Sequence, residues 1–520
     1  MPLTWLQLVL SASGTLALAY TLLPRRRGTP PPPPGPRRLP FIGNLLDVPA
    51  EKSWIKFADA GDICSISILG QQTTILNSAS AARDLLDKKS SIYSDRPFVV
   101  MAGELGGWKD ALGLMPYGDR YRRLRRTAHS FFGSPKIMTS FHPLEKQEVH
   151  KFAKRLMEKP TDFAAHIDKT AGATILRICH GYQVKEDGED DFLALGSTAM
   201  RQFSQATSPG GFLVNAIPPL RHLPPWVPGT AFLALGKVFK ETLHRMVDEP
   251  LEWVKEQIAT GTAQPSILYH LLEGKKLTEE EEFEAKWLVG SLYAGGAHTT
   301  LATISAFFKA MVLYPEVMAK AQREIDSVVG DGRLPKLSDR NDLPYTSALV
   351  LEVYRWHAGG PTAVPHCLSE DDIHNGWFIP KGSIVIANIW KMTHDPRVYT
   401  DPMVFNPGRF IPCENKQPEM DPTDLVFGFG RRICPGRVLA ETSVWLIVAT
   451  TLAVFNISCD PDGGEIDLDQ TPGIVRCVIG PRERQTGKLT MQLSLPSPFE
   501  CLIEPRSARA VELIQADVQL

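Results

Sequence analysis

The residues best suited to chemistry lie in one short stretch, residues 427–436, which reads Phe-Gly-Phe-Gly-Arg-Arg-Ile-Cys-Pro-Gly. Gly430 and Gly436 permit a tight turn with positive φ, which residues with a side chain resist. The apolar run at residues 438–452 predicts a helix, so the turn presents Cys434 just before a helix N-terminus. The backbone N–H groups and the positive dipole end of that helix favour a thiolate over a thiol. We therefore expect Cys434 to be an ionised sulfur ligand.

Two neighbours of this cysteine suit a flat, partly anionic partner. Phe427 can lie against a planar group beside the sulfur, and Arg432 brings a fixed positive charge to an anionic group. A lone thiolate held in this way suits a metal with one protein ligand, and heme iron is such a metal. The alternative for Cys434 taken alone is a buried structural cysteine in a turn.

A long apolar helix is the second feature with unusual chemistry. We expect it to begin at Thr278, a good N-cap followed by acidic residues, and to run to about residue 313. Two adjacent glycines in its middle, Gly295 and Gly296, cost about 2 kcal/mol relative to alanine. That cost indicates a close approach to something flat, or room for a small ligand. His298 and Thr299 follow directly, and the plainest alternative for Thr299 is a hydroxyl that donates to its own helix backbone.

Composition excludes some partners. The chain has 520 residues, of which 43% are hydrophobic, enough for a large core, and its net charge is −2. So small a charge gives no overall field for nucleic acid, and we expect no nucleic-acid partner. The 8 cysteines show neither a CxxC pair nor zinc spacing, which is typical of reduced, cytosolic usage.

The N-terminus predicts a membrane anchor. Residues 3–23 carry no charge and as a helix would span roughly 30 Å, about the hydrocarbon thickness of a bilayer. Arg25–Arg27 follow, so the positive-inside rule places the rest of the chain in the cytoplasm. A cleaved signal peptide is the alternative, but no basic residue precedes the apolar run and three follow it. The predicted parts are an anchor over 1–24, a basic and proline-rich hinge over 25–40 and a main domain over 41–520.

Three further segments bear on the fold. Residues 63–69 and 73–76 read as a hairpin around Gly70. The stretch from 143 to 273 is predicted to be mostly helical, with an apolar loop at residues 208–229. So much apolar surface in a loop indicates contact with a membrane, a ligand or another element.

Residues 427–436 fill every fixed position of the pattern Phe-x-x-Gly-x-Arg-x-Cys-x-Gly, and this resembles the heme-binding signature of the cytochrome P450 family. Residues 293–300 resemble that family's oxygen-activation groove, although His298 stands where an acid is usual. The resemblance covers essentially the whole chain. It is strongest to fungal microsomal members of specialised metabolism, such as O-methylsterigmatocystin oxidoreductases and tryptamine hydroxylases. It implies a mainly α fold with small β-sheets, preceded by an N-terminal transmembrane helix.

The resemblance also implies roles for individual residues. Cys434 would be the axial thiolate of a heme b, with Phe427 beside the ring. The residues that would meet the heme propionates are Arg125, Tyr121 (where tryptophan is usual), His366 and Arg432. Glu352, Arg355 and Arg409 would lock the region that carries the cysteine loop.

On the helix, Thr299 would hold protons and water at the oxygen site, and His298 would take the place of the acid that delivers protons. The ordinary pKa of histidine is about 6.5, and burial would lower it. We therefore expect the coupling of NADPH use to product formation to fall between roughly pH 6 and 8.

The implied reaction is a monooxygenation, in which one atom of O₂ enters a C–H bond and the other is reduced to water. Electrons would come from NADPH through a separate NADPH–cytochrome P450 reductase, because the chain has no flavin or nicotinamide fingerprint. The implied location is the endoplasmic reticulum membrane, in contact with lipid, with a single span and a cytoplasmic catalytic domain. The stretch 477–495 looks like an insertion relative to fungal members.

Apolar candidate pocket residues favour a lipophilic terpenoid or polycyclic substrate, with an aromatic or indolic one second: Met101, Leu105, Trp108, Met115, Val289, Thr362, Ala363 and Val364. Other functions remain open at this point. A heme-binding sensor would explain Cys434 but not the glycine-rich helix. A heme-thiolate isomerase or peroxygenase would explain His298 more naturally, and a non-enzymatic membrane protein would explain only the N-terminus.

Overall fold

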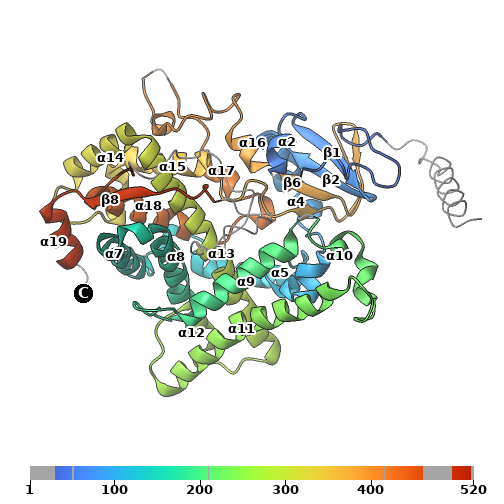
Figure 1. Ribbon diagram of the computed structural model, residues 1–520, viewed down its shortest axis with the longest axis horizontal. Coiled ribbons are helices and arrows are strands. Elements are labelled where there is room, and N and C mark those ends of the chain that lie inside the picture. The colour runs from blue at the N-terminus through green and yellow to red at the C-terminus, as the bar shows by residue number, and fades with distance from the viewer. Residues whose placement is uncertain (1–29, 50–51, 209, 415, 461–494, 517–520) are drawn as a thin grey trace, which may run out of the picture.

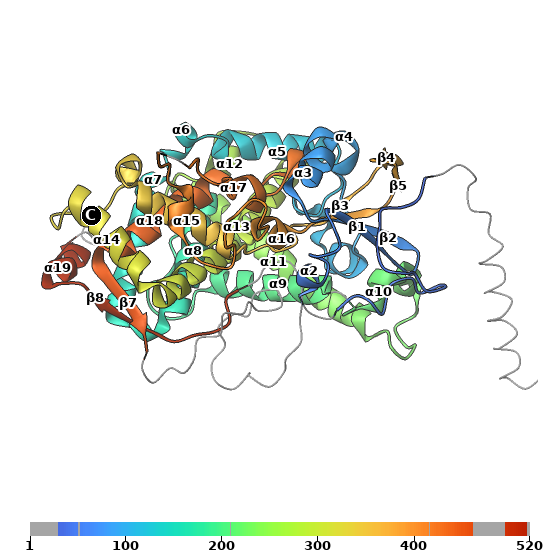
Figure 2. The same ribbon diagram turned by 90° about the horizontal axis from the view of Figure 1, so that it is seen from above.

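Helix α13 (Glu279–Leu313) runs through the middle of the molecule, and other helices surround it (Figures 1 and 2). The computed structural model describes residues 30–49, 52–208, 210–414, 416–460 and 495–516. The predicted membrane anchor, residues 25–29 of the hinge and nearly all of the predicted insertion at 477–495 lie outside these residues. The fold is mainly helical with three small sheets, as predicted.

The remaining helices of the described chain are α2 (Ser53–Lys56), α3 (Ala79–Ala82), α4 (Ser90–Tyr93), α5 (Asp119–Phe132), α6 (Pro135–Met138), α7 (His142–Glu158), α8 (Phe163–His180), α9 (Asp191–Thr207), α10 (Leu213–Ala216), α11 (Ala231–Thr260), α12 (Ile267–Leu272), α14 (Pro315–Val328), α15 (Pro344–Trp356), α16 (Ile389–Thr393), α17 (Thr423–Val426), α18 (Arg437–Val454) and α19 (Ala508–Ala516). The strands are β1 (Ile63–Ile68), β2 (Gln71–Leu76), β3 (His366–Cys367), β4 (Asp372–His374), β5 (Trp377–Ile379), β6 (Ile384–Ala387), β7 (Phe455–Cys459) and β8 (Cys501–Pro505).

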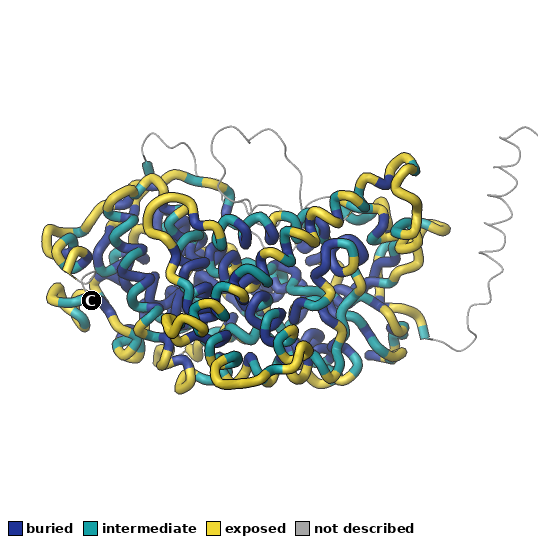
Figure 3. Tube along the Cα trace, turned by 90° about the horizontal axis from the view of Figure 1, so that it is seen from below, coloured by how far each residue is buried: buried dark blue, intermediate teal, exposed yellow. Residues whose placement is uncertain are grey.

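The start of α13 is fixed by a capping box. The hydroxyl of Thr278 accepts from the backbone N–H of Glu281, and the Glu281 carboxylate accepts from the N–H of Thr278. At the other end Pro315 begins α14, which is bent by 105° from α13. Both ends therefore lie where the sequence predicted them. Buried side chains lie on nearly all sides of α13, which makes it the central core helix. Figure 3 shows that buried residues fill the interior of the molecule and exposed ones lie at its edge.

The largest sheet has the strand order β1-β2-β6-β3. Its hairpin pairs Ile63 with Leu76, and the turn uses left-handed residues Leu69 and Gly70 (φ 49° and 87°). The hairpin is confirmed, although β2 begins at Gln71, two residues earlier than predicted. One face of the sheet contributes to a buried apolar cluster that also contains Phe429. This sheet therefore supports the loop that carries Cys434.

A buried ion network fixes the segment that leads into the cysteine loop. Glu352 and Arg355 share a face of α15, both with no exposed side chain, and their bidentate contact measures 2.7 and 2.8 Å. Arg409 approaches Glu352 at 3.1 Å and also binds Glu419 at 2.7 Å. Arg355 donates in addition to the Thr393 carbonyl at 3.0 Å. The predicted contacts of this trio are confirmed, and the sequence reading missed the fourth member, Glu419.

Within the described part of the chain, α18 alone is long and apolar enough to cross a membrane as one helix, and 72% of it is buried inside the protein. α13 and α14 pass the same test only as a bent pair. Burial identifies α18 as a core helix that carries the segment after Cys434 into the interior.

One buried carboxyl group, Glu145 on α7, lies against α18. One of its oxygens accepts from the hydroxyls of Thr442 and Ser443 at 2.9 and 2.6 Å, and the other has no hydrogen-bond partner among the described residues. Burial raises the pKa of Glu145, and the two hydroxyls offset this only in part. The folded protein therefore binds a proton at Glu145 more readily than the unfolded chain does.

We predict that Glu145→Gln stabilises the protein at alkaline pH. Because the pKa is raised in the folded state, the wild type loses stability as the pH rises through that pKa, whereas glutamine stays neutral. Thermal unfolding at pH 8 should show a gain of about 1 kcal/mol for the variant, and the gain should shrink at pH 4.

The matched control is Glu148→Gln in the same helix. Glu148 is equally buried but lies 3.0 Å from Arg177 and 3.4 Å from Lys151, so its loss should destabilise the protein. Equal unfolding of the Glu145 variant and the wild type at pH 8 would contradict the prediction.

Candidate active site

The cysteine loop, residues 427–436, is closed by a backbone hydrogen bond from the N–H of Cys434 to the carbonyl of Phe427, at 2.8 Å. Gly428 and Gly430 have φ of 78° and 55°, a region that favours glycine. A side chain at Gly430 would begin 2.1 Å from the carbonyl oxygen of Leu86. The N–H of Gly430 donates to the carboxylate of Asp87. The loop conformation therefore depends on Gly430 both for φ and for space.

The electrostatics of Cys434 differ from the expectation. Burial raises the pKa of the Cys434 thiol above its ordinary value, although the N–H of Gly436 and the charges of Arg125 and Arg437 all lower it. The N–H of Gly436 at the helix N-terminus acts in the predicted direction, but desolvation is the larger effect on the pKa of the free thiol. A metal cation supplies the missing positive charge, since a coordinating thiol loses its proton on binding.

Arg432 is a residue of the cysteine loop, and it is 8% exposed. It donates to the carbonyls of Ser94 and Met115 at 2.7 and 2.8 Å, and its guanidinium lies 3.8 Å from the ring centroid of Tyr121. The Tyr121 hydroxyl donates to the carbonyl of Arg431 at 2.8 Å. A phenol has one proton to donate, and Tyr121 uses it on the Arg431 carbonyl. In this structure Tyr121 therefore supports the cysteine loop and Arg432, and has no proton left to donate to a heme propionate.

Arg96 is a cation of this site that the sequence reading missed. Its guanidinium donates to the carbonyls of Val364 and Pro365, both at 2.7 Å. Burial and the nearby charge of Arg432 lower the pKa of Arg96 to about 9. Its place beside Pro97 in an extended segment offered no helix or motif signal, so only the folded chain reveals it.

His366 lies beside the same two arginines. Its Nδ1 is 2.7 Å from the carbonyl of Tyr93, and because a carbonyl can only accept, Nδ1 carries the proton. Burial, then the charges of Arg96 and Arg432, lower the pKa of His366 to about 3. The neutral ring would donate from Nε2 only after gaining a second proton, and a neighbouring anion favours that gain.

Arg125, predicted from the sequence, is half-buried on α5. No hydrogen bond or ion pair joins it to another described residue, yet its charge lowers the pKa of Cys434 and so lies near the sulfur. A half-buried guanidinium suits an anionic partner. Arg122 and Arg123 on the same helix are instead exposed and paired, with Asp119 and Glu284 respectively, which matches the solvated basic face expected there.

These residues fit a heme. The heme iron would bring a positive charge to the Cys434 thiol, which burial keeps protonated. The two heme carboxylates would bring negative charge to three arginines and one histidine: Arg96, Arg125, Arg432 and His366. Phe427 is half-buried beside the cysteine, edge-on to Tyr354 at 5.5 Å between ring centroids, and Arg437 lies over it at 5.8 Å. Its ring is thereby fixed next to the sulfur.

Along the buried part of α13, from Ala285 to Leu313, two residues are exposed, Gly295 and Thr299. A side chain at Gly295 would meet nothing within 4 Å, and Gly359 approaches the same helix face at Ala302. The Thr299 hydroxyl donates to the Gly295 carbonyl at 3.0 Å, as the plainer alternative predicted. Its oxygen still has lone pairs that can accept a proton or a water.

His298 is 4% exposed, and neither ring nitrogen has a hydrogen-bond partner among the described residues. Burial lowers the pKa of His298 to about 4. The expectation that this ring titrates between pH 6 and 8 is therefore wrong, because no nearby anion offsets the loss of water. The imidazole is neutral throughout that range.

The predicted pocket residues fall into three groups. Met101 and Leu105 pack with residues of the apolar loop, Trp108, Met115 and Val289 belong to a second cluster, and Thr362, Ala363 and Val364 lie near Arg96. The rings of Trp108 and Phe203 join the first two clusters at 4.7 Å. Met101 and Val289 have no exposed surface and are core residues here.

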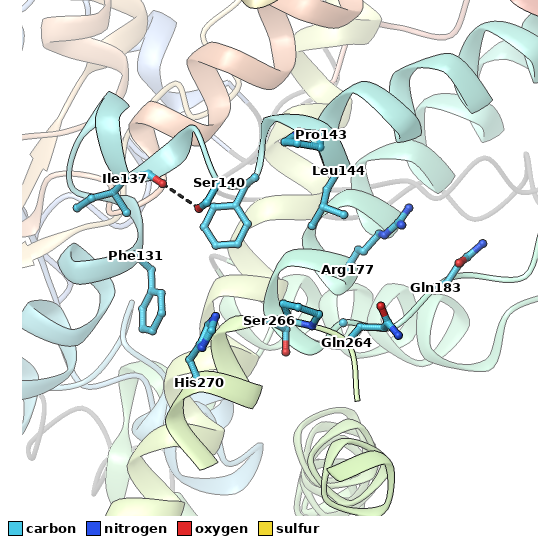
Figure 4. Close-up of a pocket in the computed structure, with 13 residues that line it drawn as sticks. Phe131, Ile137, Ser140, Pro143, Leu144, Arg177, Gln183, Gln264, Ser266 and His270 are labelled. Carbon is cyan, nitrogen blue, oxygen red and sulfur yellow. Dashed lines mark hydrogen bonds between the residues drawn. The ribbon is translucent and has the colours of Figure 1, made fainter. Parts of the chain in front are cut away.

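A separate hollow of about 680 Å³ lies between the α5–α7 segment, α8 and α12 (Figure 4). Its lining includes Phe131, Arg177 and His270, and none of the predicted site residues. Arg177 is already paired with Glu148 at 3.0 Å. This hollow is therefore distinct from the site around Cys434.

Comparison with known proteins finds relatives over nearly the whole chain. The sequence model of the family "Cytochrome P450" matches residues 33–483. A cytochrome P450 monooxygenase, claR, of Ampulloclitocybe clavipes is 43% identical, with 96% of this chain and 91% of that protein aligned. Cytochrome P450 monooxygenase 208 of Postia placenta is 42% identical over 98% of both chains. The O-methylsterigmatocystin oxidoreductase of Aspergillus flavus is 36% identical over 95% and 92% of the two chains.

A half-buried cysteine loop directly before a core helix, surrounded by cationic side chains in a mainly helical chain, is typical of heme-thiolate enzymes. This chain belongs to the cytochrome P450 family, whose members bind heme through a cysteine thiolate, and it is a monooxygenase of that family.

We predict that Arg125→Gln weakens heme retention, because a heme propionate loses its half-buried cationic partner. The apparent affinity for hemin should fall about 10-fold, the size of one charge-assisted hydrogen bond. Arg126→Gln is the matched control, since Arg126 is the exposed next residue. Heme content per polypeptide, measured after identical purification, checks this, and equal content in the two variants would contradict it.

Proposed function

We propose that this protein inserts one atom of O₂ into a C–H bond of a lipophilic secondary metabolite, with electrons from NADPH delivered by a separate reductase. The observation that carries the proposal is the exposed pair Gly295 and Thr299 within the buried part of α13, from Ala285 to Leu313. Bound heme supplies the chemistry that activates oxygen. The protein supplies Cys434 as the axial ligand and the cations of Arg96, Arg125 and Arg432 for the propionates.

Thr299 is the residue proposed to hold protons. Its hydroxyl proton is directed at the Gly295 carbonyl, which leaves the oxygen free to accept from water on the exposed face of the helix. Gly295 keeps that face clear, because a side chain there would occupy it. His298, neutral and buried, can pass a proton only by accepting at one nitrogen while donating from the other.

The substrate is proposed to be a small lipophilic molecule, with terpenoid or polycyclic scaffolds favoured and aromatic or indolic ones second. Apolar residues supply most of the candidate contacts, from Leu105 and Trp108 to Ala363 and Val364. One relative is named for a specific small molecule, O-methylsterigmatocystin, which supports this substrate class.

The basic side of α5 is proposed to receive the reductase. Arg126 is exposed on α5, and Arg431 is exposed on the cysteine loop, to which Tyr121 of α5 is hydrogen-bonded. Exposed cations close to the ligand loop suit an acidic electron donor. The endoplasmic reticulum location rests on the sequence of residues 1–27 and on apolar loop residues, of which Trp226 is 82% and Leu213 70% exposed.

The test of the function is single-atom incorporation. The full-length protein, a fungal reductase, NADPH and ¹⁸O₂ are incubated with a panel of terpenoid, polycyclic and indolic scaffolds. One ¹⁸O per product, strictly dependent on NADPH, is expected. Product formed with hydrogen peroxide but not with NADPH and reductase would instead indicate a peroxygenase, and rearranged product without ¹⁸O would indicate an isomerase.

Thr299→Ala should lower the product formed per NADPH consumed by about 10-fold, because the proton-holding hydroxyl is lost. Thr299→Ser should retain most of the coupling. The matched control is Thr300→Ala, since Thr300 also donates to its own helix, to the Gly296 carbonyl at 2.9 Å, but is half-buried. Equal uncoupling by the two alanine variants would remove Thr299 from the proposed role.

Coupling should not follow the titration of His298 between pH 6 and 8. With a pKa of about 4, the ring is neutral over the whole range, and it gains a proton only under more acidic conditions. Product per NADPH is measured for the wild type and His298→Asn from pH 6 to 8, and parallel profiles are expected. A fall with a midpoint in that range, present in the wild type and absent in the variant, would contradict the buried neutral ring.

Removal of residues 1–27 should move much of the protein from the microsomal pellet to the soluble fraction. A remainder should stay bound through the apolar loop, and adding Leu213→Ser and Trp226→Ser should release it. Sedimentation of the three proteins checks this. If the protein that lacks residues 1–27 and carries both serine substitutions still pelleted completely, this would contradict membrane contact through these two segments.

A further inference from the structure

Two cysteines far apart in sequence lie opposite each other at the end of a small sheet. Strands β7 and β8 are antiparallel, and Cys459 is the direct partner of Cys501. Both thiols are free in the structure. The known chemistry of the family uses neither, because the ligand position belongs to Cys434.

The hydrogen-bond register decides how close the two cysteines are. The N–H of Arg506 donates to the carbonyl of Val454 at 2.9 Å, so residues 454 and 506 form a hydrogen-bonded pair. In antiparallel strands such pairs alternate with non-hydrogen-bonded ones, so residues 459 and 501 form a non-hydrogen-bonded pair, with Cα atoms about 4.5 Å apart. That spacing lies within the range of about 4.4 to 6.8 Å that a disulfide spans.

The two side chains also point to the same face. Phe455 and Ile457 of β7 and Ile503 of β8 are buried on one side of the sheet, and Cys459 and Cys501 continue that alternation. Cys501 is 8% exposed, whereas Cys459, the last residue of β7, is exposed. Besides burial and Asp460, the Cys459 side chain is itself a cause of the raised pKa of Cys501, so the two sulfurs lie near each other.

We propose that Cys459 and Cys501 form a reversible cross-strand disulfide when the protein meets a peroxide. Hydrogen peroxide first oxidises the accessible Cys459 thiol to a sulfenic acid and leaves as water. The thiol of Cys501 then displaces the sulfenic hydroxyl as a second water, and the S–S bond forms. Two thiols thereby give up two electrons and two protons, and one peroxide becomes two waters.

The bridge would tie together the two ends of residues 460–500. It closes a loop of about forty residues, which lowers the entropy of the unfolded chain. It also fixes β7, which continues directly from α18, at its free end. A thiol reductant reverses the change, so the bridge serves as an oxidation-dependent clamp in a compartment that is ordinarily reducing.

The experiment is a non-reducing peptide map of the full-length protein after treatment with a small excess of hydrogen peroxide. A linked peptide pair containing Cys459 and Cys501 should appear, should vanish after dithiothreitol, and should be absent from Cys459→Ser. Cys413→Ser is the matched control. Cys413 is exposed, but the residue opposite it in its backbone β-bridge is Lys416, which cannot form a disulfide. The control should form the linked pair as the wild type does.

Thermal unfolding gives a second readout. The oxidised wild type should unfold about 2–5 °C above the reduced protein, and Cys459→Ser should show no such difference. Cys459 recovered only as sulfinic acid, or linked to a cysteine other than Cys501, would overturn the proposal. An equal shift in melting temperature in Cys459→Ser would overturn the assignment of the stabilisation to this bridge.

Discussion

The position of one sulfur atom depends on a loop that tolerates glycine alone at residue 430. A side chain there would overlap the carbonyl of Leu86, so the loop and the segment before α4 can approach only as they do. Hydrogen bonds from Tyr121 to the Arg431 carbonyl and from Arg432 to the Ser94 carbonyl hold the loop from the opposite side. The rest of the site is built outward from this fixed point.

The site gathers positive charge in a buried place, and that arrangement is unfavourable without an anion. Burial and then the charge of Arg432 lower the pKa of Arg96, and burial and then both arginines lower the pKa of His366. Burial raises the pKa of the Cys434 thiol in the same region. A group that brings both a metal cation to the sulfur and carboxylates to the arginines relieves both costs at once, which is why the protein residues by themselves indicate heme.

Local sequence patterns predicted much of the fold and of the site. The cysteine loop, the capped helix from Thr278 and the contact of Glu352 with Arg355 are short-range features, and each lies where its spacing placed it. The rest depends on segments hundreds of residues apart. The Tyr121 hydroxyl meets the Arg431 carbonyl, and Arg96 meets the residues before His366, only in the folded chain. The low pKa of His298 likewise follows from burial without an anionic partner, which its neighbours in sequence do not reveal.

The central claim is that Cys434 ligates the heme iron through its thiolate. The most direct measurement is the difference spectrum of the reduced protein with carbon monoxide, for the wild type, Cys434→Ser and Cys413→Ser. The account predicts the thiolate–carbon monoxide signature in the wild type and in Cys413→Ser, and its complete loss in Cys434→Ser, with the polypeptide still folded by circular dichroism. A Cys434→Ser protein that keeps the signature would contradict the account.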